Sequence, residues 1–168
     1  MELKKLVDET LKIFGINNVR DLTGELMQAC VKNDESKFRN FKALVGDLSI
    51  DWLQKIFQYY EADRKEKKQD YTPKSLAALV GQLAGNADTI IDMCAGSGAL
   101  TIQKWARNKN QYFELYEFDE KVITYLLFNM MIRNINCTVY NADVLQDEIY
   151  HEYRVKSGLE FGELEVIK

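Results

Sequence analysis

Several residue types are scarce in this chain of 168 residues, and each scarcity excludes a class of protein. There is one histidine, His151, and the three cysteines lie far apart, at Cys30, Cys94 and Cys137. Such a set matches neither a disulfide framework nor the ligand spacing of a zinc site, so we expect reduced thiols and no bound metal. No apolar stretch approaches the roughly 20 residues that span a bilayer, and the N-terminus lacks a signal-peptide pattern. We therefore expect a cytoplasmic protein that does not enter a membrane.

Positive charge is also in short supply. Lys and Arg number 22 against 26 Asp and Glu, which gives a net charge of −4. Residues 1–70 are balanced, whereas residues 71–168 carry the whole acidic excess. Proteins that grip duplex DNA alone usually present a basic face. The composition therefore counts against autonomous DNA binding, though not against action on DNA beside a partner.

The first 66 residues have the apolar periodicity of helices. Apolar residues form 46% of the whole chain, which is enough for a folded core. Here they recur at helical spacing, with Gly15 as a stop after the first run. The spacing predicts four helices, at about residues 3–14, 21–31, 38–45 and 50–60. The fully polar run of residues 63–70 is typical of a linker.

From residue 71 onward the pattern alternates between helix and strand. Thr72 can cap a helix that begins at Pro73, and this helix carries an apolar stripe formed by Leu76, Leu79, Val80 and Leu83. Three strands are expected, with helices between them, at Thr89–Ile91, Tyr112–Tyr116 and Cys137–Tyr140. Strands separated in this way imply a parallel sheet with right-handed crossovers. The sequence thus predicts a helical region at 1–66 and, at 67–168, the N-terminal half of an α/β Rossmann-like domain.

Acidic residues follow all three predicted strands. Asp92 ends the first strand just before the glycine turn Gly96-Ser97-Gly98, which lets the backbone approach a ligand closely. Glu117 ends the second strand, where an acid can accept hydrogen bonds from two ribose hydroxyls. Asp143 follows the third strand, where an acid can meet an adenine amino group. These positions together predict a nucleoside site at one edge of the sheet.

The acid just before the glycine turn, Asp92, distinguishes between nucleoside ligands. A nicotinamide dinucleotide places phosphates at a bare helix N-terminus, where Asp92 would repel them. The third glycine that such enzymes usually carry is also absent, because position 101 is Thr. A cationic sulfonium ligand with an ammonium group fits these residues better.

Four segments resemble motifs of one enzyme family. Gln69–Pro73, Asp92–Gly98, Tyr116–Asp119 and Asn141–Leu145 are similar, in order and spacing, to the cofactor motifs of DNA adenine-N6 methyltransferases. The likeness is greatest to the methylation subunits of type I restriction-modification systems and their phage relatives. It implies a class I methyltransferase fold that binds S-adenosyl-L-methionine (SAM).

The resemblance also implies roles for particular residues. The loop before the first α/β helix would shape a pocket for the methionine carboxylate, and the glycine turn would hold the methionine moiety. Glu117 would bind the ribose, and Asp143 would bind the adenine. The residues implied in cofactor binding are Tyr71, Thr72, Pro73, Asp92, Ala95, Gly96, Gly98, Glu117, Ala142 and Asp143. A simpler interpretation stays open for Thr72-Pro73, which can merely start a helix, and for Glu117 and Asp143, which can merely cap the next elements.

The family's catalytic loop is missing from these residues. That loop, Asn/Asp-Pro-Pro-aromatic, binds the target amino group and stacks on the extruded base, whereas the one proline here is Pro73. Tyr150, His151 and Tyr153 are conceivable substitutes, although a solvated helix explains them equally well. The strand-like segment 159–167 could pair beside the first strand, or a second chain could cover that edge.

Two functions therefore remain open. One is methyl transfer to adenine in DNA when a partner protein completes the site, within a homodimer or a hetero-oligomer. The other is a catalytically inactive SAM-binding module that regulates or acts as a decoy. Transfer to RNA, protein or a small molecule is a further alternative.

Overall fold

The computed structural model describes residues 1–60 and 72–168. The predicted linker at 63–70 and the predicted site residue Tyr71 lie outside the described residues. The helices are α1 (Leu3–Phe14), the short 3-10 helix η1 (Val19–Asp21), α2 (Leu22–Val31), α3 (Glu35–Val45), α4 (Trp52–Tyr60), α5 (Lys74–Leu83), α6 (Ala99–Arg107) and α7 (Glu120–Ile132). The strands are β1 (Thr89–Asp92), β2 (Tyr112–Glu117), β3 (Cys137–Asp143), β4 (Glu148–Ser157) and β5 (Gly162–Val166).

The predicted N-terminal helices are confirmed. Helix α1 stops at Gly15, whose φ of 70° is left-handed and whose N–H bonds back to the carbonyl oxygens of Leu11 and Lys12. Helix α3 begins after Asp34, because the Asp34 carboxylate accepts the Lys37 N–H at 3.1 Å. The Gly15 stop is a local signal, which is why the sequence revealed it. The Asp34 cap was not predicted, and it places the start of α3 at Glu35, ahead of the expected start near residue 38.

The predicted α/β fold is confirmed, and the three strands expected from the sequence, β1, β2 and β3, run parallel. The sheet as a whole is mixed, because two further strands join it as an antiparallel hairpin. Its order is β1-β2-β3-β4-β5, with β1, β2 and β3 parallel and β4 and β5 antiparallel to their neighbours. The short connection between β3 and β4 is the reason, since parallel neighbours need a crossover of a dozen or more residues. The solvated helix weighed as one explanation for Tyr150, His151 and Tyr153 is also ruled out, because all three lie in β4.

The C-terminal strand lies at the opposite edge from the one we considered. We expected that residues 159–167 could pair beside β1, but β5 pairs with β4 instead. Strand β1 pairs with β2 and is the other edge of the five-stranded sheet. Hairpin pairing of neighbouring segments closes a shorter loop than a return to β1, and loop closure is less costly for short loops.

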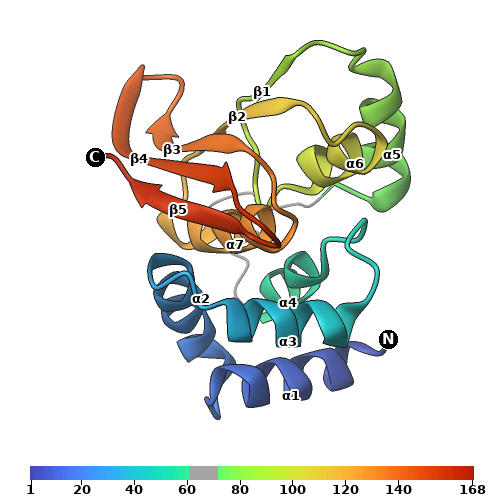
Figure 1. The fold of residues 1–168 in the computed structure, drawn as a ribbon, viewed down its shortest axis with the longest axis vertical. Helices are drawn as coiled ribbons and strands as arrows, with labels where there is room; N and C mark the ends of the chain where they lie inside the picture. The colour runs from blue at the N-terminus through green and yellow to red at the C-terminus, as the bar shows by residue number, and fades with distance from the viewer. Residues whose placement is uncertain (61–71) are drawn as a thin grey trace.

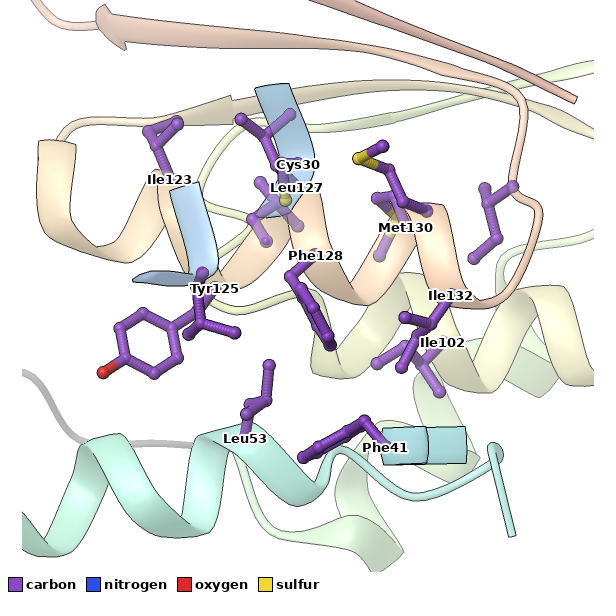
Figure 2. Close-up of a cluster of buried hydrophobic side chains, with 14 of the residues drawn as sticks. Cys30, Phe41, Leu53, Ile102, Ile123, Tyr125, Leu127, Phe128, Met130 and Ile132 are labelled. Carbon is purple, nitrogen blue, oxygen red and sulfur yellow. The ribbon is translucent and has the colours of Figure 1, made fainter. Parts of the chain in front are cut away.

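Helix α7 is the centre of the core, between the sheet and the N-terminal helices (Figure 1). All of its residues from Val122 to Ile132 are buried, as expected for a helix that is apolar all round. The Phe128 ring packs against the rings of Phe14, Phe38 and Phe41, with distances between ring centroids of 5.7, 5.3 and 5.4 Å. Figure 2 shows α7 side chains such as Phe128 facing Phe41 and Leu53 of the helical region. One hydrophobic cluster therefore joins residues of both halves of the chain.

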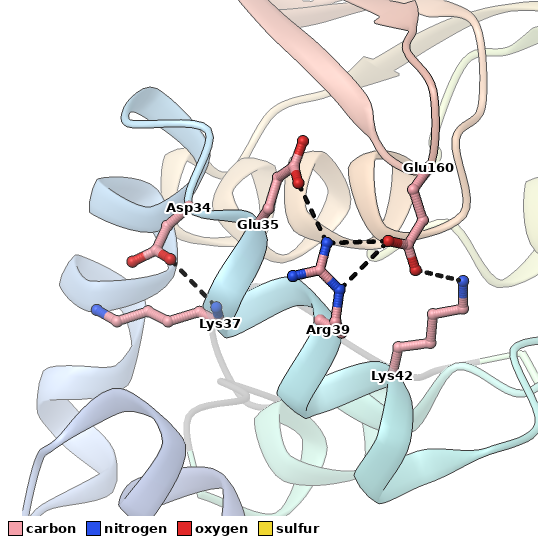
Figure 3. Close-up of polar contacts among 6 residues, drawn as sticks. All are labelled: Asp34, Glu35, Lys37, Arg39, Lys42 and Glu160. Atoms are coloured by element: carbon pink, nitrogen blue, oxygen red, sulfur yellow. Dashed lines mark hydrogen bonds and ion pairs between the residues drawn. The ribbon is translucent and has the colours of Figure 1, made fainter.

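A polar contact also joins the helical region to the C-terminal hairpin. Glu160, just before β5, accepts hydrogen bonds from Arg39 at 3.0 Å and from Lys42 at 3.3 Å, both on α3 (Figure 3). These side chains are substantially exposed, and exposed ion pairs typically contribute only ~0–1 kcal/mol. The aromatic core is therefore the main link between the two halves.

The apolar stripe of α5 is exposed. Leu76, Leu79 and Leu83 all face solvent, Leu83 with 76% of its surface accessible. The small residues of the opposite side, Ala77 and Gly81, are buried, and Gly81 lies against Gln103 of α6. In the described parts of the chain no helix is long and apolar enough to cross a membrane.

Candidate functional site

The glycine turn between β1 and α6 has the geometry that its sequence predicts. Gly96 and Gly98 have φ values of 56° and 97°, which favour glycine over other residues. A Cβ on Gly98 would stand 2.8 Å from Met130 Cε of α7, so this glycine also permits close packing against α7. A Cβ on Gly96 would meet nothing within 4 Å. The backbone at Gly96 therefore has open space beside it, which leaves room for a ligand.

The turn is bound to the end of the second strand. The Gly96 N–H donates to Glu117 Oε2 at 2.9 Å, and the Ala95 N–H donates to the Tyr116 carbonyl oxygen at 2.9 Å. Ala95 is buried, and its own carbonyl oxygen accepts the Gly98 N–H. Three predicted site residues, Ala95, Gly96 and Glu117, are thus brought together.

Strand register aligns the three predicted acids at the carboxyl edge of the sheet. Asp92 is in register with Leu115, and Glu117 lies two residues beyond Leu115, so both side chains point to the same face. Glu117 is in register with Asn141, and Asp143 lies two residues farther along. Each acid therefore ends one of three neighbouring parallel strands.

The Asn141 side chain ties the second and third strand ends together. Its amide nitrogen donates to the Glu117 carbonyl oxygen at 3.1 Å and to the Phe118 carbonyl oxygen at 2.9 Å. Asn141 is buried, so these bonds are shielded from water. They hold the backbone that carries Glu117 against the third strand.

Glu117 is half-buried and keeps hydrogen-bonding capacity. Burial raises the pKa of its carboxyl, although the N–H groups of Asp119 and Gly96 oppose that shift. These donors lie 2.8 and 2.9 Å from its two oxygens. An ionised carboxylate has about four acceptor sites. The Phe118 N–H is a further donor to this carboxylate, so at least one acceptor site remains for a ligand hydroxyl group.

The Asp92 carboxylate accepts fewer hydrogen bonds from the chain than the Glu117 carboxylate does. Burial raises the pKa of its carboxyl, and the Cys94 N–H, 3.3 Å from Oδ1, opposes the shift. No Lys or Arg among the described residues forms an ion pair with it. A cation placed beside Asp92 would favour the charged form of its carboxyl. An ammonium group therefore fits this position.

Asp143 has a structural role in the chain itself. Its Oδ1 accepts the N–H groups of Leu145 at 2.9 Å and Gln146 at 3.2 Å, which shapes the turn between β3 and β4. The simpler interpretation of Asp143 as a cap thus has direct support. Its Oδ2 accepts no hydrogen bond from the described residues. Ala142 is buried within β3, opposite Ile149 of β4.

Thr72 and Pro73 lie on the wall of a cavity of about 360 Å³. Ala99, the first residue of α6, lines the same cavity. The predicted acids Asp92, Glu117 and Asp143 are not among the described residues that line it, so this cavity does not join Thr72 and Pro73 to the strand ends. Pro73 is the residue that precedes α5, with no side-chain cap. The prediction that Thr72 caps this helix was therefore wrong.

Comparison with protein families shows which family this chain belongs to. Residues 46–157, about two thirds of the chain, match the family model of N-6 DNA methylases. This chain belongs to the N-6 DNA methylase family. No curated protein and no solved structure matches it. The resemblance to adenine-N6 methyltransferases is confirmed, and the likeness to type I restriction-modification subunits stays a prediction.

The family match covers the candidate site of this chain. It begins at Gly46, in the loop before α4, and ends at Ser157, the last residue of β4. All three strand ends lie within it, as do Thr72 and Pro73. Members of the family generally use SAM, and the open space beside Gly96 together with the half-buried acids fits such a ligand.

The conceivable substitutes for the catalytic loop, Tyr150, His151 and Tyr153, occupy β4. Tyr153 is buried in the core. His151 Nδ1 lies 3.4 Å from Asn141 Oδ1, and the Tyr150 ring lies 6.4 Å from the Phe118 ring. Phe118 directly follows Glu117 and is 62% exposed. Sequence reasoning missed this exposed aromatic, although its place directly after Glu117 was a signal.

Sequence reasoning also missed a buried polar cluster behind the turn. Asp51 accepts the Ser97 hydroxyl at 2.6 Å, and Asn129 of α7 bonds to Asp51 and to the Ser97 carbonyl oxygen. The available signal was Arg133, a lone charge that directly follows an apolar helix and therefore needs a buried partner.

Proposed function

We propose that this protein binds SAM at the carboxyl ends of β1, β2 and β3. SAM supplies an electrophilic methyl group, so the protein's own task is to bind and orient. We assign the methionine moiety to Asp92 and the glycine turn, the ribose to Glu117, and the adenine to Ala142 and Asp143. Tyr71, Thr72 and Pro73 would border the methionine carboxylate.

The contact between the Gly96 N–H and Glu117 gives this proposal its main support. It joins the turn after β1 to the acid after β2 at 2.9 Å. A site of that kind needs the turn and the acid to face one ligand together. Without this contact, the motifs would be only a sequence likeness.

Calorimetry and thermal shift test the proposal. The protein is titrated with SAM, with S-adenosylhomocysteine and, as a control, with NAD⁺. A ligand that binds only the folded state raises the apparent stability as its concentration increases. We expect both sulfur-containing nucleosides to stabilise the protein and NAD⁺ to have no effect. Stabilisation by NAD⁺ alone would contradict the proposal.

We further propose that the methyl acceptor is adenine in DNA, and that a polypeptide with an Asn/Asp-Pro-Pro-aromatic loop completes the site. Two features support such a partner. Strand β1 is an edge of the sheet, and the α5 stripe with Leu79 and Leu83 is exposed. Open strand edges and exposed apolar patches are typical of interaction surfaces.

Transfer is tested with radiolabelled SAM and adenine-containing DNA, with the protein alone and together with the products of neighbouring genes. We expect label in DNA only in a combination that contains the missing loop. DNA in which adenine is replaced by N6-methyladenine is the matched control, because its amino group already carries a methyl group. Absence of transfer in every combination would exclude this activity.

The second candidate is a SAM-binding regulatory or decoy module without turnover. The absence of a Pro-Pro sequence from these 168 residues favours this candidate. The segment after Asp143, where the catalytic loop was expected, instead forms a hairpin with β3, which favours it as well. This function predicts SAM binding by calorimetry without methyl transfer in any combination. The transfer assay above therefore separates the two candidates.

A further inference from the structure

A buried polar cluster joins the N-terminal helices to the glycine turn. The Asp51 cluster consists of Asp51, Ser97, Asn129 and Arg133, which come from the residue before α4, from the turn, from α7 and from the residue after α7. The Ser97 hydroxyl donates to Asp51 Oδ2 at 2.6 Å. Asn129 Nδ2 donates to Asp51 Oδ1 and to the Ser97 carbonyl oxygen, each at 2.9 Å. Ser97 is therefore held through both its side chain and its backbone.

All four side chains of the Asp51 cluster are buried, the most exposed being Asp51 at 7%. The Arg133 guanidinium donates to the carbonyl oxygens of Leu48 and Ile50, in the loop before α4. Burial raises the pKa of the Asp51 carboxyl, and the positive charge of Arg133 opposes that shift. Buried polar groups are costly unless their partners are in place. The loop, the turn and α7 therefore form one connected arrangement.

Ser97 lies between two glycines with positive φ, Gly96 and Gly98. Glycine restricts the backbone least, so a turn with two of them is poorly restrained by its own sequence. The hydrogen bond from the Gly96 N–H to Glu117 depends on the conformation of this turn. An anchor at Ser97 restrains both glycines at once.

We infer that Asp51 is a positioning residue, which holds Ser97 and thereby the glycine turn in the conformation that meets the cofactor. This inference rests on the proposed SAM site and extends it to a residue outside the strand ends. The family match begins at Gly46 and includes the loop that carries Asp51. That loop leads into α4, which packs against α7. SAM affinity is therefore coupled to the docking of the helical region, and coupling of this kind is reciprocal.

Ser97→Ala is the first test, because it removes the hydroxyl and leaves the backbone. Thr10→Val is its matched control, since it also removes one buried hydroxyl, which donates to the Leu6 carbonyl oxygen at 2.6 Å in α1. By calorimetry, Ser97→Ala should weaken SAM binding about tenfold, equivalent to about 1.4 kcal/mol, and Thr10→Val should bind like the original protein. Equal SAM affinities of Ser97→Ala and the original protein would overturn the inference.

Asp51 itself is tested by amide hydrogen exchange of the ligand-free protein. Asp51→Ala removes the anchor, whereas Asp51→Asn keeps the shape and one acceptor and can donate to the Ser97 hydroxyl. Protection of the Gly96 N–H should decrease from the original protein to Asp51→Asn and further to Asp51→Ala, and SAM affinity should follow the same order. Unchanged Gly96 exchange in folded Asp51→Ala would overturn the inference.

The two experiments separate this inference from the proposed function. Gly96 exchange requires no ligand, so it decides whether Asp51 restrains the turn even if SAM fails to bind the original protein. Failure of SAM to bind would reject the proposed function alone. If Asp51→Ala does not fold, Ser97→Ala and Asp51→Asn provide the same comparison.

Discussion

The face of the sheet that packs against α7 and the carboxyl edge of the same sheet have opposite chemistry. On the α7 side, buried aliphatic and aromatic side chains fill the space, and Phe128 alone contacts three other aromatic rings. At the carboxyl edge, Asp92 and Glu117 are half-buried carboxylates, and no described residue gives either of them a cation. The side chains of the α7 side are packed against one another, whereas Asp92 and Glu117 at the edge accept backbone hydrogen bonds and have no ion-pair partner among the described residues.

This difference separates residues that stabilise the fold from residues that serve a ligand. Burying apolar side chains lowers the free energy of the folded state. Burying a carboxyl without a cation disfavours its charged form, which is why burial raises the pKa of Asp92 and Glu117. Substitutions on the α7 side should therefore mainly lower the stability of the fold, whereas substitutions at the carboxyl edge should mainly lower the affinity for a ligand.

The largest effect is expected in the core. Phe128→Ala would leave a cavity between α7 and three aromatic rings, and Phe→Ala changes of this kind typically cost about 3–5 kcal/mol of unfolding free energy. Urea denaturation measures the loss. Phe128→Leu, which keeps more of the volume, should lose less. A loss below about 1 kcal/mol for Phe128→Ala would show that the α7 side is not the main source of stability.

The next effect is on binding at the carboxyl edge. Asp92→Ala should weaken SAM binding by about 1.5–3 kcal/mol, because it removes a charge-assisted acceptor for the ammonium group. Calorimetry measures the affinity, and urea denaturation of the same sample should show a folded protein. Affinity equal to that of the original protein would place the ammonium group elsewhere.

A smaller, pH-dependent effect is expected at Glu117. Its pKa is raised in the folded state, so the folded protein holds more protons than the unfolded chain, and stability contributed at this site decreases as pH rises above about 4. Glu117→Gln removes this titration. Urea denaturation at pH 4 and at pH 7 should therefore show the variant gaining relative to the original protein at the higher pH. A relative shift in the other direction would contradict the burial of this carboxyl.

The smallest effect is expected on α5. Leu79→Gln should change the unfolding free energy by less than about 0.5 kcal/mol, because Leu79 is exposed. Ala77→Leu, on the buried side of the same helix, is the control and should cost about 1–3 kcal/mol through overpacking. Urea denaturation compares the two. A large loss in Leu79→Gln would mean that the stripe is covered, as it would be in a self-associated protein.

Local patterns predicted much of the site and of the fold. Gly15, Gly96 and Gly98 have the backbone conformations that their neighbourhoods suggested, and Asp92 and Glu117 end the strands expected for them. These features depend on residues close together in the chain. The neighbouring positions of parallel strand ends then follow from the crossover rule.

Pairing between distant residues was beyond such patterns. The segment around His151 was interpreted as a solvated helix. Residues 152–156 alternate between polar and apolar side chains, which is also compatible with a strand, and pairing with β3 makes the segment β4. The stripe containing Leu79 had the spacing of a buried helix face, yet α5 packs through Ala77 and Gly81 instead. In both cases the local signal was consistent with more than one packing partner.

By itself, the sequence determined the four N-terminal helices, the three strands that end in acids, and the glycine turn, because each depends on spacing and backbone preference within a few residues. Only the tertiary structure decided that β4 and β5 run antiparallel, that β1 is an edge, and that Asp51 anchors Ser97. Asp51 and Ser97 are 46 residues apart. Their contact results from packing of α4 and α7 around a buried charge, and no local rule specifies such packing.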